Sequence, residues 1–479
     1  MTDFSAPLVV DLDGTLIKTD LLLETANQLA ARHPLRVFRL LARSSGSRSA
    51  LKACLAEECV IDPASLPYNE HLVAWLREEK QQGRRLVLAT ASHRLLADAV
   101  QRHLGLFDEV LATEGDINLK SERKRDLLVS RYGERGFDYV GNHAADLPVW
   151  RGARQAYVVG GSPRLVARAR AQGAVTHVIE DHRRSRLGSL ARALRPHQWV
   201  KNLLLLVPLF AAHDYRNLAS LGHALLGLVV FCLLASSVYV LNDLADVADD
   251  RHHPLKRKRP FASGDLGLVD GWMAWPALLI AACVLAGFFM PPFFLGCLAT
   301  YLVLTLAYSF RLKRLAVLDV LTLAALYTLR VAAGAAAISV QPSFWLLAFS
   351  MFFFLSLAFI KRYCELKIAT NGDGERIRGR GYVRGDLEVV STMGVAAGYI
   401  AILVLALYVN DSPTTQLYRS PRLIWLACPV LLFWISRAWL IAHRGDMHDD
   451  PIVFALKDPV SWAAGGCFVG LFVLATLIG

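Results

Sequence analysis

The chain has 479 residues, a formal net charge of +11 and 54% hydrophobic residues. Its mean hydropathy of +0.37 excludes an ordinary water-soluble protein, and we expect a lipid bilayer rather than nucleic acid as its main partner. Residues 1–195 are mixed in composition, whereas long apolar runs alternate with short charged loops from about Trp199 onward. We therefore predict a soluble domain over residues 1–180, a link over 181–197 and a membrane domain over 198–479.

The amino-terminal stretch MTDFSAPLVVDLDGT has neither a basic segment nor a long apolar segment. We expect no secretory signal peptide, so the first domain should stay in the cytosol.

Three short stretches of the soluble part predict strands that end in polar residues. PLVVDLDGTLIKTD (7–20) is an apolar strand followed by a tight turn with Asp11 and Asp13. Two such carboxylates can share a metal ion, and one can attack phosphorus while the other transfers protons. RRLVLATAS ends near Thr90, and FDYVGNHAADLPVW leads to Asp146. Alternating strand and helix patterns indicate an α/β domain with a parallel sheet covered by helices on both faces.

Together with Lys124 in SERKRDLL, these stretches resemble the four motifs of the haloacid dehalogenase (HAD) superfamily. The resemblance implies a Rossmann-like phosphatase fold in which Asp11 is the nucleophile and Asp13 the acid/base. It also implies that Thr90 and Lys124 bind phosphate and that Mg²⁺ is held by Asp11, Asp13 and Asp146.

Two further features of this part bear on its activity. The helical stretch 21–82 resembles a small cap inserted between the first two motifs. The superfamily's usual GDxxxD motif has Asn142 in place of its first acid, so a retained but inactive HAD fold stays a second interpretation.

The link, DHRRSRLGSLARALRPH (181–197), is a basic amphipathic segment that we expect to lie on the membrane surface. After it the hydropathy predicts an all-α bundle of about nine membrane spans. They lie near 199–212, 221–241, 271–290, 292–310, 316–340, 343–360, 391–409, 423–441 and 459–478. The first of these is short, and a position partly in the membrane interface is the alternative for it. Basic residues crowd the loops after the second, fourth, sixth and eighth spans, which places these loops in the cytosol of a bacterial-type plasma membrane.

The stretch VYVLNDLADVADDRHHPLKRKRPFASG (238–264) carries acidic residues at the cytosolic end of the second span. If the helix continues at about 100° per residue, one amide and four acidic side chains share an arc of roughly 120°. These residues are Asn242, Asp243, Asp246, Asp249 and Asp250. Stacked carboxylates repel, and Mg²⁺ bound with a substrate diphosphate would relieve the repulsion. The alternative is a solvated interfacial turn with internal ion pairs.

This stretch resembles NDxxDxxxD, the first Asp-rich motif of the UbiA superfamily of membrane prenyltransferases. The resemblance implies helices around a central cavity, a polyprenyl substrate, and Mg²⁺ held by Asn242, Asp243, Asp246 and Asp250. Aromatic prenyltransferases of this superfamily carry a second acidic motif after the sixth span. Here the loop, KRYCELKIATNGDGERIRGRGYVRGD, is rich in cations and has no clean acidic pair among Asp373, Glu375 and Asp386.

Five other segments resemble a different branch, the decaprenyl-phosphate phosphoribosyltransferases. They are RPHQWVKN (195–202), RPFASG (259–264), YSFRLKRLAVLDV (308–320), LRVAAGA (329–335) and KRYCEL (361–366). The branch joins a polyprenyl phosphate to phosphoribosyl pyrophosphate (PRPP), so many cations are needed for phosphates. The candidates are Lys201, Arg251, Lys256, Arg259, Lys313, Arg330, Lys361 and Arg362, and Glu365 is expected to orient Lys361.

Three hypotheses follow. The first is a phosphoribosyltransferase whose fused HAD domain removes the 5-phosphate from the lipid product. The second is an aromatic prenyltransferase that uses a polyprenyl diphosphate, and the third is a transferase with a non-catalytic HAD docking module. The sequence predicts neither the polyprenyl length nor an oligomeric state.

Overall fold

The computed structural model describes residues 6–478 except 34–35, 37–53, 56–57, 59–60, 115–118, 173, 182–183, 371–379, 411–416 and 448–449. The chain forms two compact units. The first unit comprises Met1–Arg195 and Tyr239–Pro276, and the second comprises Pro196–Val238 and Ala277–Gly479. The first unit thus includes a segment, 239–276, that the predicted boundary assigns to the membrane domain.

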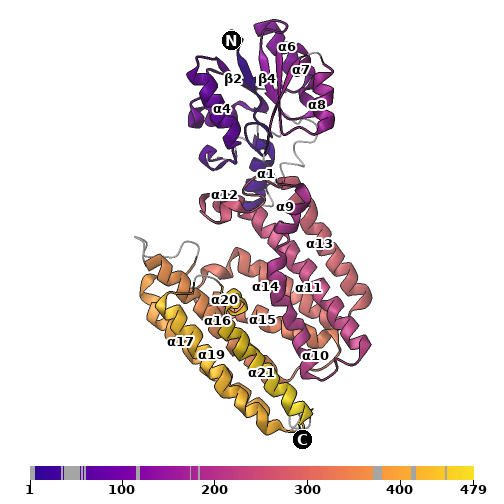
Figure 1. The fold of residues 1–479 in the computed structure, drawn as a ribbon, viewed down its shortest axis with the longest axis vertical. Coiled ribbons are helices and arrows are strands. Elements are labelled where there is room, and N and C mark those ends of the chain that lie inside the picture. Colours follow the sequence, from indigo (N-terminus) through magenta and orange to yellow (C-terminus); the bar gives the residue numbers. More distant parts are fainter. Residues whose placement is uncertain are drawn as a thin grey trace. The chain divides into compact units, whose positions relative to one another are not determined.

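The amino-terminal part of the first unit is built on a parallel sheet of six strands with the order β3-β2-β1-β4-β5-β6 (Figure 1). The strands are β1 (Leu8–Val10), β2 (Leu86–His93), β3 (Glu109–Thr113), β4 (Asp138–Gly141), β5 (Gln155–Val159) and β6 (Val175–Ile179). The predicted parallel α/β sheet is therefore confirmed.

Alternate residues of the central strand bury into two different cores, as the period of a strand requires. Leu8 and Val10 belong to one core together with side chains of α1, α4 and α5. Val9 belongs to the other, with side chains of α6, α7 and α8. The helices are α1 (Leu21–Arg32), α4 (Glu70–Gln81), α5 (Arg94–Leu104), α6 (Glu122–Tyr132), α7 (Leu147–Gly152) and α8 (Pro163–Arg170). They cover both faces, as expected.

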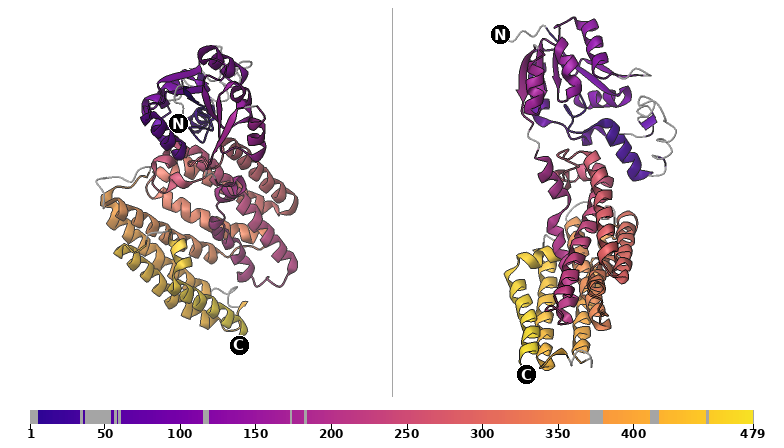
Figure 2. Two further views of the ribbon diagram at one scale, coloured as in Figure 1. Left: turned by 45° about the horizontal axis from the view of Figure 1, so that its top comes forward. Right: turned by 90° about the vertical axis from the view of Figure 1, so that its right-hand side faces the viewer.

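The remaining described residues are mostly helical, and eight helices are long and apolar enough to cross a membrane. Seven of these are α11 (Leu218–Ala245), α13 (Leu268–Phe289), α14 (Pro292–Phe310), α15 (Leu318–Ala337), α16 (Phe344–Thr370), α17 (Leu387–Val409) and α19 (Ala427–Arg444). The eighth is α21 (Pro459–Leu477). The short helices include α9 (Arg186–Ala193), α12 (Val247–His252) and α20 (Pro451–Lys457). The long helices that end the chain run side by side in the right-hand view of Figure 2.

The first predicted span, 199–212, is wrong as a membrane-crossing helix. It consists of the 3₁₀ helix η3 (Pro196–Leu206) and the five-residue helix α10 (Val207–Ala211). Pro208 lies in the first turn of α10 and has no N–H to continue the hydrogen-bond ladder of the preceding segment. The other eight predicted spans each fall on a long helix.

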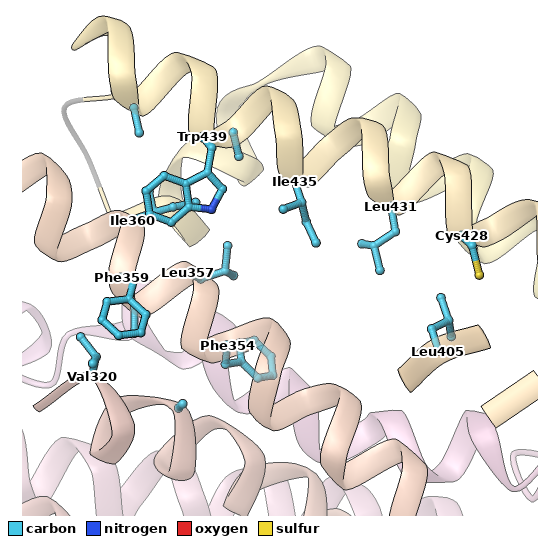
Figure 3. Close-up of a cluster of buried hydrophobic side chains, with 14 of the residues drawn as sticks. Val320, Phe354, Leu357, Phe359, Ile360, Leu405, Cys428, Leu431, Ile435 and Trp439 are labelled. Carbon is cyan, nitrogen blue, oxygen red and sulfur yellow. The ribbon is translucent and has the colours of Figure 1, made fainter. Parts of the chain in front are cut away.

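The core of the second unit is apolar and aromatic. Figure 3 shows Phe354 and Leu357 of α16 facing Ile435 and Trp439 of α19. Trp439 packs over Gly394 of α17, where a Cβ would lie 2.2 Å from the indole ring. This close helix packing needs glycine at that position.

Candidate active sites

Asp11 lies at the carboxyl end of β1, next to the buried Lys124. The Asp11 N–H donates to the carbonyl of Val140 in the neighbouring strand at 3.0 Å. Lys124 Nζ donates to Asp11 Oδ1 at 2.6 Å and to the hydroxyl of Tyr139 at 3.0 Å. Burial lowers the pKa of Lys124, but the carboxylates of Asp11 and Asp146 outweigh this and raise it. A fixed positive charge therefore lies beside the predicted nucleophile.

Asp13 is held by three donors from two elements. Its Oδ1 accepts the N–H of Leu21 at 2.8 Å, and its Oδ2 accepts the hydroxyls of Ser92 at 2.7 Å and Thr90 at 3.1 Å. Burial, together with the charge of Asp20, raises the pKa of Asp13 to about 7. Such a carboxyl can give and take protons near neutral pH. The sequence prediction missed Ser92, although it follows Thr90 closely at the end of the same strand.

Asp146 is the second carboxyl close to Asp11. Its Oδ2 accepts the N–H groups of Asn142 at 3.1 Å and His143 at 2.9 Å. Burial and the charge of Asp11 raise the pKa of Asp146 to about 6. A divalent cation between these buried carboxylates would relieve their repulsion, and their all-oxygen donor set suits Mg²⁺.

Asn142, the departure from the HAD pattern, ties two loops together. Its Nδ2 donates to the carbonyl of Gly14 at 2.8 Å. Gly14 has φ +77°, and a Cβ there would lie 2.6 Å from the same Nδ2. Asn142 therefore fixes the DLDG turn through a neutral hydrogen bond where the family pattern has a charge.

Within the described residues, no group of three or more His, Cys, Asp and Glu side chains is placed to hold a metal ion. The predicted trio of Asp11, Asp13 and Asp146 stays a prediction. Asp13 and Asp146 each accept three hydrogen bonds from the protein. The carboxylate oxygens of all three residues are of the type that Mg²⁺ prefers.

The Asp-rich segment also lies in the first unit, where α11 ends. Helical hydrogen bonds continue through the break at Asp246, whose N–H donates to Asn242 O at 2.9 Å. Asp243 and Asp250 are buried, and Asn242 and Asp246 are half-buried. Asp249 of the predicted arc is exposed, and the common arc itself stays a prediction.

Two arginines neutralise the buried carboxylates of this segment. Arg259 Nη1 donates to Asp243 Oδ1 at 3.1 Å and to Asp250 Oδ2 at 2.6 Å, and Arg195 also pairs with Asp243. In the described part of the chain, the side chains of Asn242 and Asp246 have no hydrogen-bond partner. Their oxygens are free for a cation, and the donor set of oxygens again fits Mg²⁺. The sequence prediction missed Arg195, which begins the segment RPHQWVKN.

Arg251, a predicted phosphate ligand, has protein partners in the structure. Its guanidinium donates to both carboxylate oxygens of Glu24, at 3.0 and 2.7 Å, and to the carbonyl of Ala262 at 3.1 Å. Three of its five N–H groups thus link α1 to the segment after α11, and its phosphate-binding role stays a prediction. Lys256 lies exposed in the 3₁₀ helix η4 (Lys256–Lys258).

In the second unit, two predicted cations meet on one carboxylate. Lys361 and Lys201 lie 3.1 and 3.4 Å from Asp450 Oδ2. Burial raises the pKa of Asp450, but the two ammonium groups outweigh it and lower that pKa to about 2. Lys201 also lines an apolar cavity of about 640 Å³ whose walls include Phe353 and Trp434.

Arg330 and Arg362 are buried and fully engaged. Arg330 donates to Asn202 Oδ1 at 2.9 Å and to the hydroxyl of Tyr301 at 2.8 Å. Arg362 donates to Asp319, Glu365 and Tyr308. The expected contact of Glu365 with Lys361 is therefore corrected, since Glu365 accepts from Arg362 and Lys361 donates to Asp450.

The remaining predicted residues of the second unit are Lys313 and the acidic residues of the loop after α16. Lys313 is half-buried in the 3₁₀ helix η5 (Leu312–Arg314). Asp373 and Glu375 of the cationic loop lie outside the described residues, whereas Asp386 accepts the N–H of Val383 at 2.9 Å where α17 begins.

The family model of the UbiA prenyltransferase family matches residues 203–457. The chain belongs to this family. The model of the haloacid dehalogenase-like hydrolases matches residues 8–151, so a HAD-like domain precedes the UbiA domain.

A relative matches nearly the whole length of this chain. "Uncharacterized protein y4nM" of Sinorhizobium fredii is 37% identical over 474 residues, which cover 99% of this chain and 92% of that protein. Nodulation protein NoeC of Azorhizobium caulinodans is 40% identical over 283 residues, which cover 58% of this chain and 89% of NoeC.

Another relative is the decaprenyl-phosphate phosphoribosyltransferase of Mycolicibacterium smegmatis. It is 33% identical over 285 residues, covering 57% of this chain and 88% of that enzyme. A solved UbiA homolog from Archaeoglobus fulgidus, bound to DMAPP and Mg²⁺, is 18% identical with a TM-score of 0.47, covering 60% of this chain and all of that one.

Proposed function

We propose that the UbiA half transfers 5-phosphoribose from PRPP to a polyprenyl phosphate, and that the HAD half then removes the 5-phosphate from the lipid product. The main support is the sequence identity between this chain and relatives named decaprenyl-phosphate phosphoribosyltransferase, which extends over most of the length of those relatives. The charges of the candidate residues also support this proposal. One acidic helix end is accompanied by many cations, whereas an aromatic prenyltransferase would carry a second acidic motif.

In the transfer step, an oxygen of the lipid phosphate attacks C1 of the ribose, and the bond from C1 to the pyrophosphate oxygen breaks. Mg²⁺ on Asn242, Asp246 and the neighbouring Asp243 and Asp250 would neutralise the leaving pyrophosphate. Arg259 lies against the carboxylates of Asp243 and Asp250 and would donate hydrogen bonds to the oxygens of the pyrophosphate.

Lys201 and Lys361 are the cations best suited to the lipid phosphate. They share one carboxylate, Asp450. An incoming phosphate would add a second anionic partner to the same pair, and the apolar cavity at Lys201 suits an isoprenoid chain.

In the hydrolytic step, Asp11 attacks phosphorus while Asp13 protonates the departing O5 of the ribose. Asp13 then takes a proton from water, which attacks the aspartyl-phosphate and releases inorganic phosphate. Lys124 stabilises the charge on the phosphoryl oxygens. Loss of the 5-phosphate makes the two-step sequence hard to reverse.

We place both reactions on the cytosolic side of a bacterial plasma membrane. The basic loops after α11 and α14 support this orientation through the positive-inside rule.

The experiment uses purified full-length protein in vesicles with Mg²⁺, decaprenyl phosphate and PRPP labelled in the ribose. We expect labelled lipid and free pyrophosphate only when the lipid phosphate is present. A parallel reaction with polyprenyl diphosphate and 4-hydroxybenzoate should give no prenylated product. Prenylation without PRPP turnover would instead establish an aromatic prenyltransferase.

A further inference from the structure

One wall of the phosphatase pocket comes from far along the chain. The pocket has a volume of about 420 Å³ and contains Asp11, Asp13 and Lys124. It is also lined by Gly267, Leu268 and Val269, which lead into the membrane helix α13. We call these three residues the α13 wall.

Buried polar contacts join α1 of the HAD domain to the residues around this wall. Glu24 and Arg251 form a two-pronged ion pair in which the side chains are only 7% and 6% exposed. Asn27 Nδ2 donates to the carbonyl of Leu244 at 2.8 Å, and its Oδ1 accepts Trp272 Nε1 at 3.0 Å. Since a buried ion pair is costly to break, α1 is held firmly against this segment.

The same helix begins inside the catalytic pocket. The N–H of Leu21, its first residue, donates to Asp13, and Leu23 lines the pocket. Gly264 lies against Lys18 of the catalytic loop, with φ +74° and a Cβ position 2.7 Å from Lys18 Cβ. The wall is therefore fixed relative to the proposed catalytic acid by α1 and by this close contact.

The length of α13 places this wall at the membrane boundary. The helix has 22 residues. At about 1.5 Å per residue it is roughly 33 Å long, little more than the hydrocarbon core of about 30 Å. Its first residues, Leu268 and Val269, must therefore lie close to the lipid surface, and Trp272 follows at a depth typical of interfacial tryptophan.

We propose that the α13 wall selects the substrate of the phosphatase, which is a phosphate monoester carried by a membrane lipid. Val269 is apolar and 45% exposed, so it can contact the first isoprenoid units beside the reacting headgroup. Lys18 and Lys120 line the same pocket and match the second phosphate that links ribose to lipid. This inference rests on the proposed phosphatase function and adds to it the residues that recognise the lipid.

The test measures selectivity in the full-length protein. The two substrates are a 5-phosphoribosyl-phosphoryl lipid with a short prenyl chain, presented in vesicles, and soluble ribose 5-phosphate, which carries the same ester. Wild type should hydrolyse the lipid ester with a kcat/KM at least ten times that for ribose 5-phosphate. Val269→Asp should lower this ratio at least tenfold, and the isosteric Val269→Thr should lower it less.

Val178→Asp is the matched control, because Val178 is 47% exposed on β6 of the same unit and lies outside the pocket lining. It should leave the ratio at its wild-type value. An unchanged ratio in both Val269 variants, or a wild-type ratio near one, would overturn the proposed wall. Failure of wild type to hydrolyse either ester would overturn the phosphatase function itself, and the inference with it.

Discussion

Asp243, Asp246 and Asp249 follow one another closely in the sequence, yet their surroundings differ. Asp243 is buried and paired with Arg195 and Arg259. Asp246 is half-buried, and its carboxylate has no hydrogen-bond partner among the described residues, whereas Asp249 is exposed. Burial and the two arginines therefore set Asp243 and Asp246 apart from Asp249. We propose that Asp243 and Asp246, together with Asn242 and Asp250, hold Mg²⁺, and that Asp249 does not.

Asp243→Ala and Asp246→Ala should each lower transfer from PRPP by about 100-fold or more, because the leaving pyrophosphate loses its metal. Asp249→Ala is the matched control and should keep wild-type transfer. The rate of pyrophosphate release measures the effect, with membrane insertion checked in each variant. Equal losses in all three variants, or full activity in the first two, would contradict the metal role.

Residue spacing predicted the acidic segment, and resemblance to a known family predicted the four HAD motifs, because each of these motifs is local in the sequence. It could not predict the partners that come from distant elements. Arg251 was expected on a phosphate because the neighbouring sequence is basic, but its partner Glu24 lies 227 residues away. The partner of Lys361 could not be predicted for the same reason. Helical periodicity pointed to Glu365, whereas Lys361 donates to Asp450.

At the level of elements, the helix α1 contacts two different parts of the first unit. Its first residue contacts Asp13, the proposed acid/base, and its buried Glu24 and Asn27 contact the segment around the Asp-rich motif. The sequence predicted this stretch as part of a cap. Its docking face could not be predicted, because the two polar residues that form it look like ordinary surface residues of an amphipathic helix.

Glu24→Gln should destabilise the first unit by about 3–5 kcal/mol, because it leaves the Arg251 guanidinium buried without a charged partner. Thermal unfolding of the full-length protein should show a lower midpoint. Glu78→Gln, at an exposed position of α4, serves as the control and should unfold like wild type. The double variant Glu24→Leu/Arg251→Met should recover most of the loss, and its failure to do so would argue against the ion pair as the cause.

The membrane helices were predictable for a simple reason, since a run of about 20 apolar residues has few alternatives to a span. The segment 199–212 passed the same test of composition but contains Pro208, and its backbone follows a 3₁₀ path into a short helix. Composition alone does not report the backbone hydrogen bonds that decide between these outcomes.

For the whole molecule, the basic loops predict a single orientation in the membrane. In a variant without the eight native cysteines, Lys258→Cys should react with a membrane-impermeant maleimide only after permeabilisation of spheroplasts. Gln341→Cys, in the exposed turn between α15 and α16, should react in intact spheroplasts. The reverse pattern would place the phosphatase and the acidic segment on the outer side.

The fusion of the HAD-like and UbiA domains gives each molecule one proposed site that makes a phosphate monoester and another that hydrolyses it. The most direct test compares the lipid product of wild type with that of Asp11→Asn, using decaprenyl phosphate and labelled PRPP. Mass spectrometry should find the ribosyl lipid without its 5-phosphate for wild type, and the 5-phosphoribosyl lipid for Asp11→Asn with an unchanged transfer rate. The same phosphorylated lipid from both proteins, or no labelled lipid from either, would contradict the account.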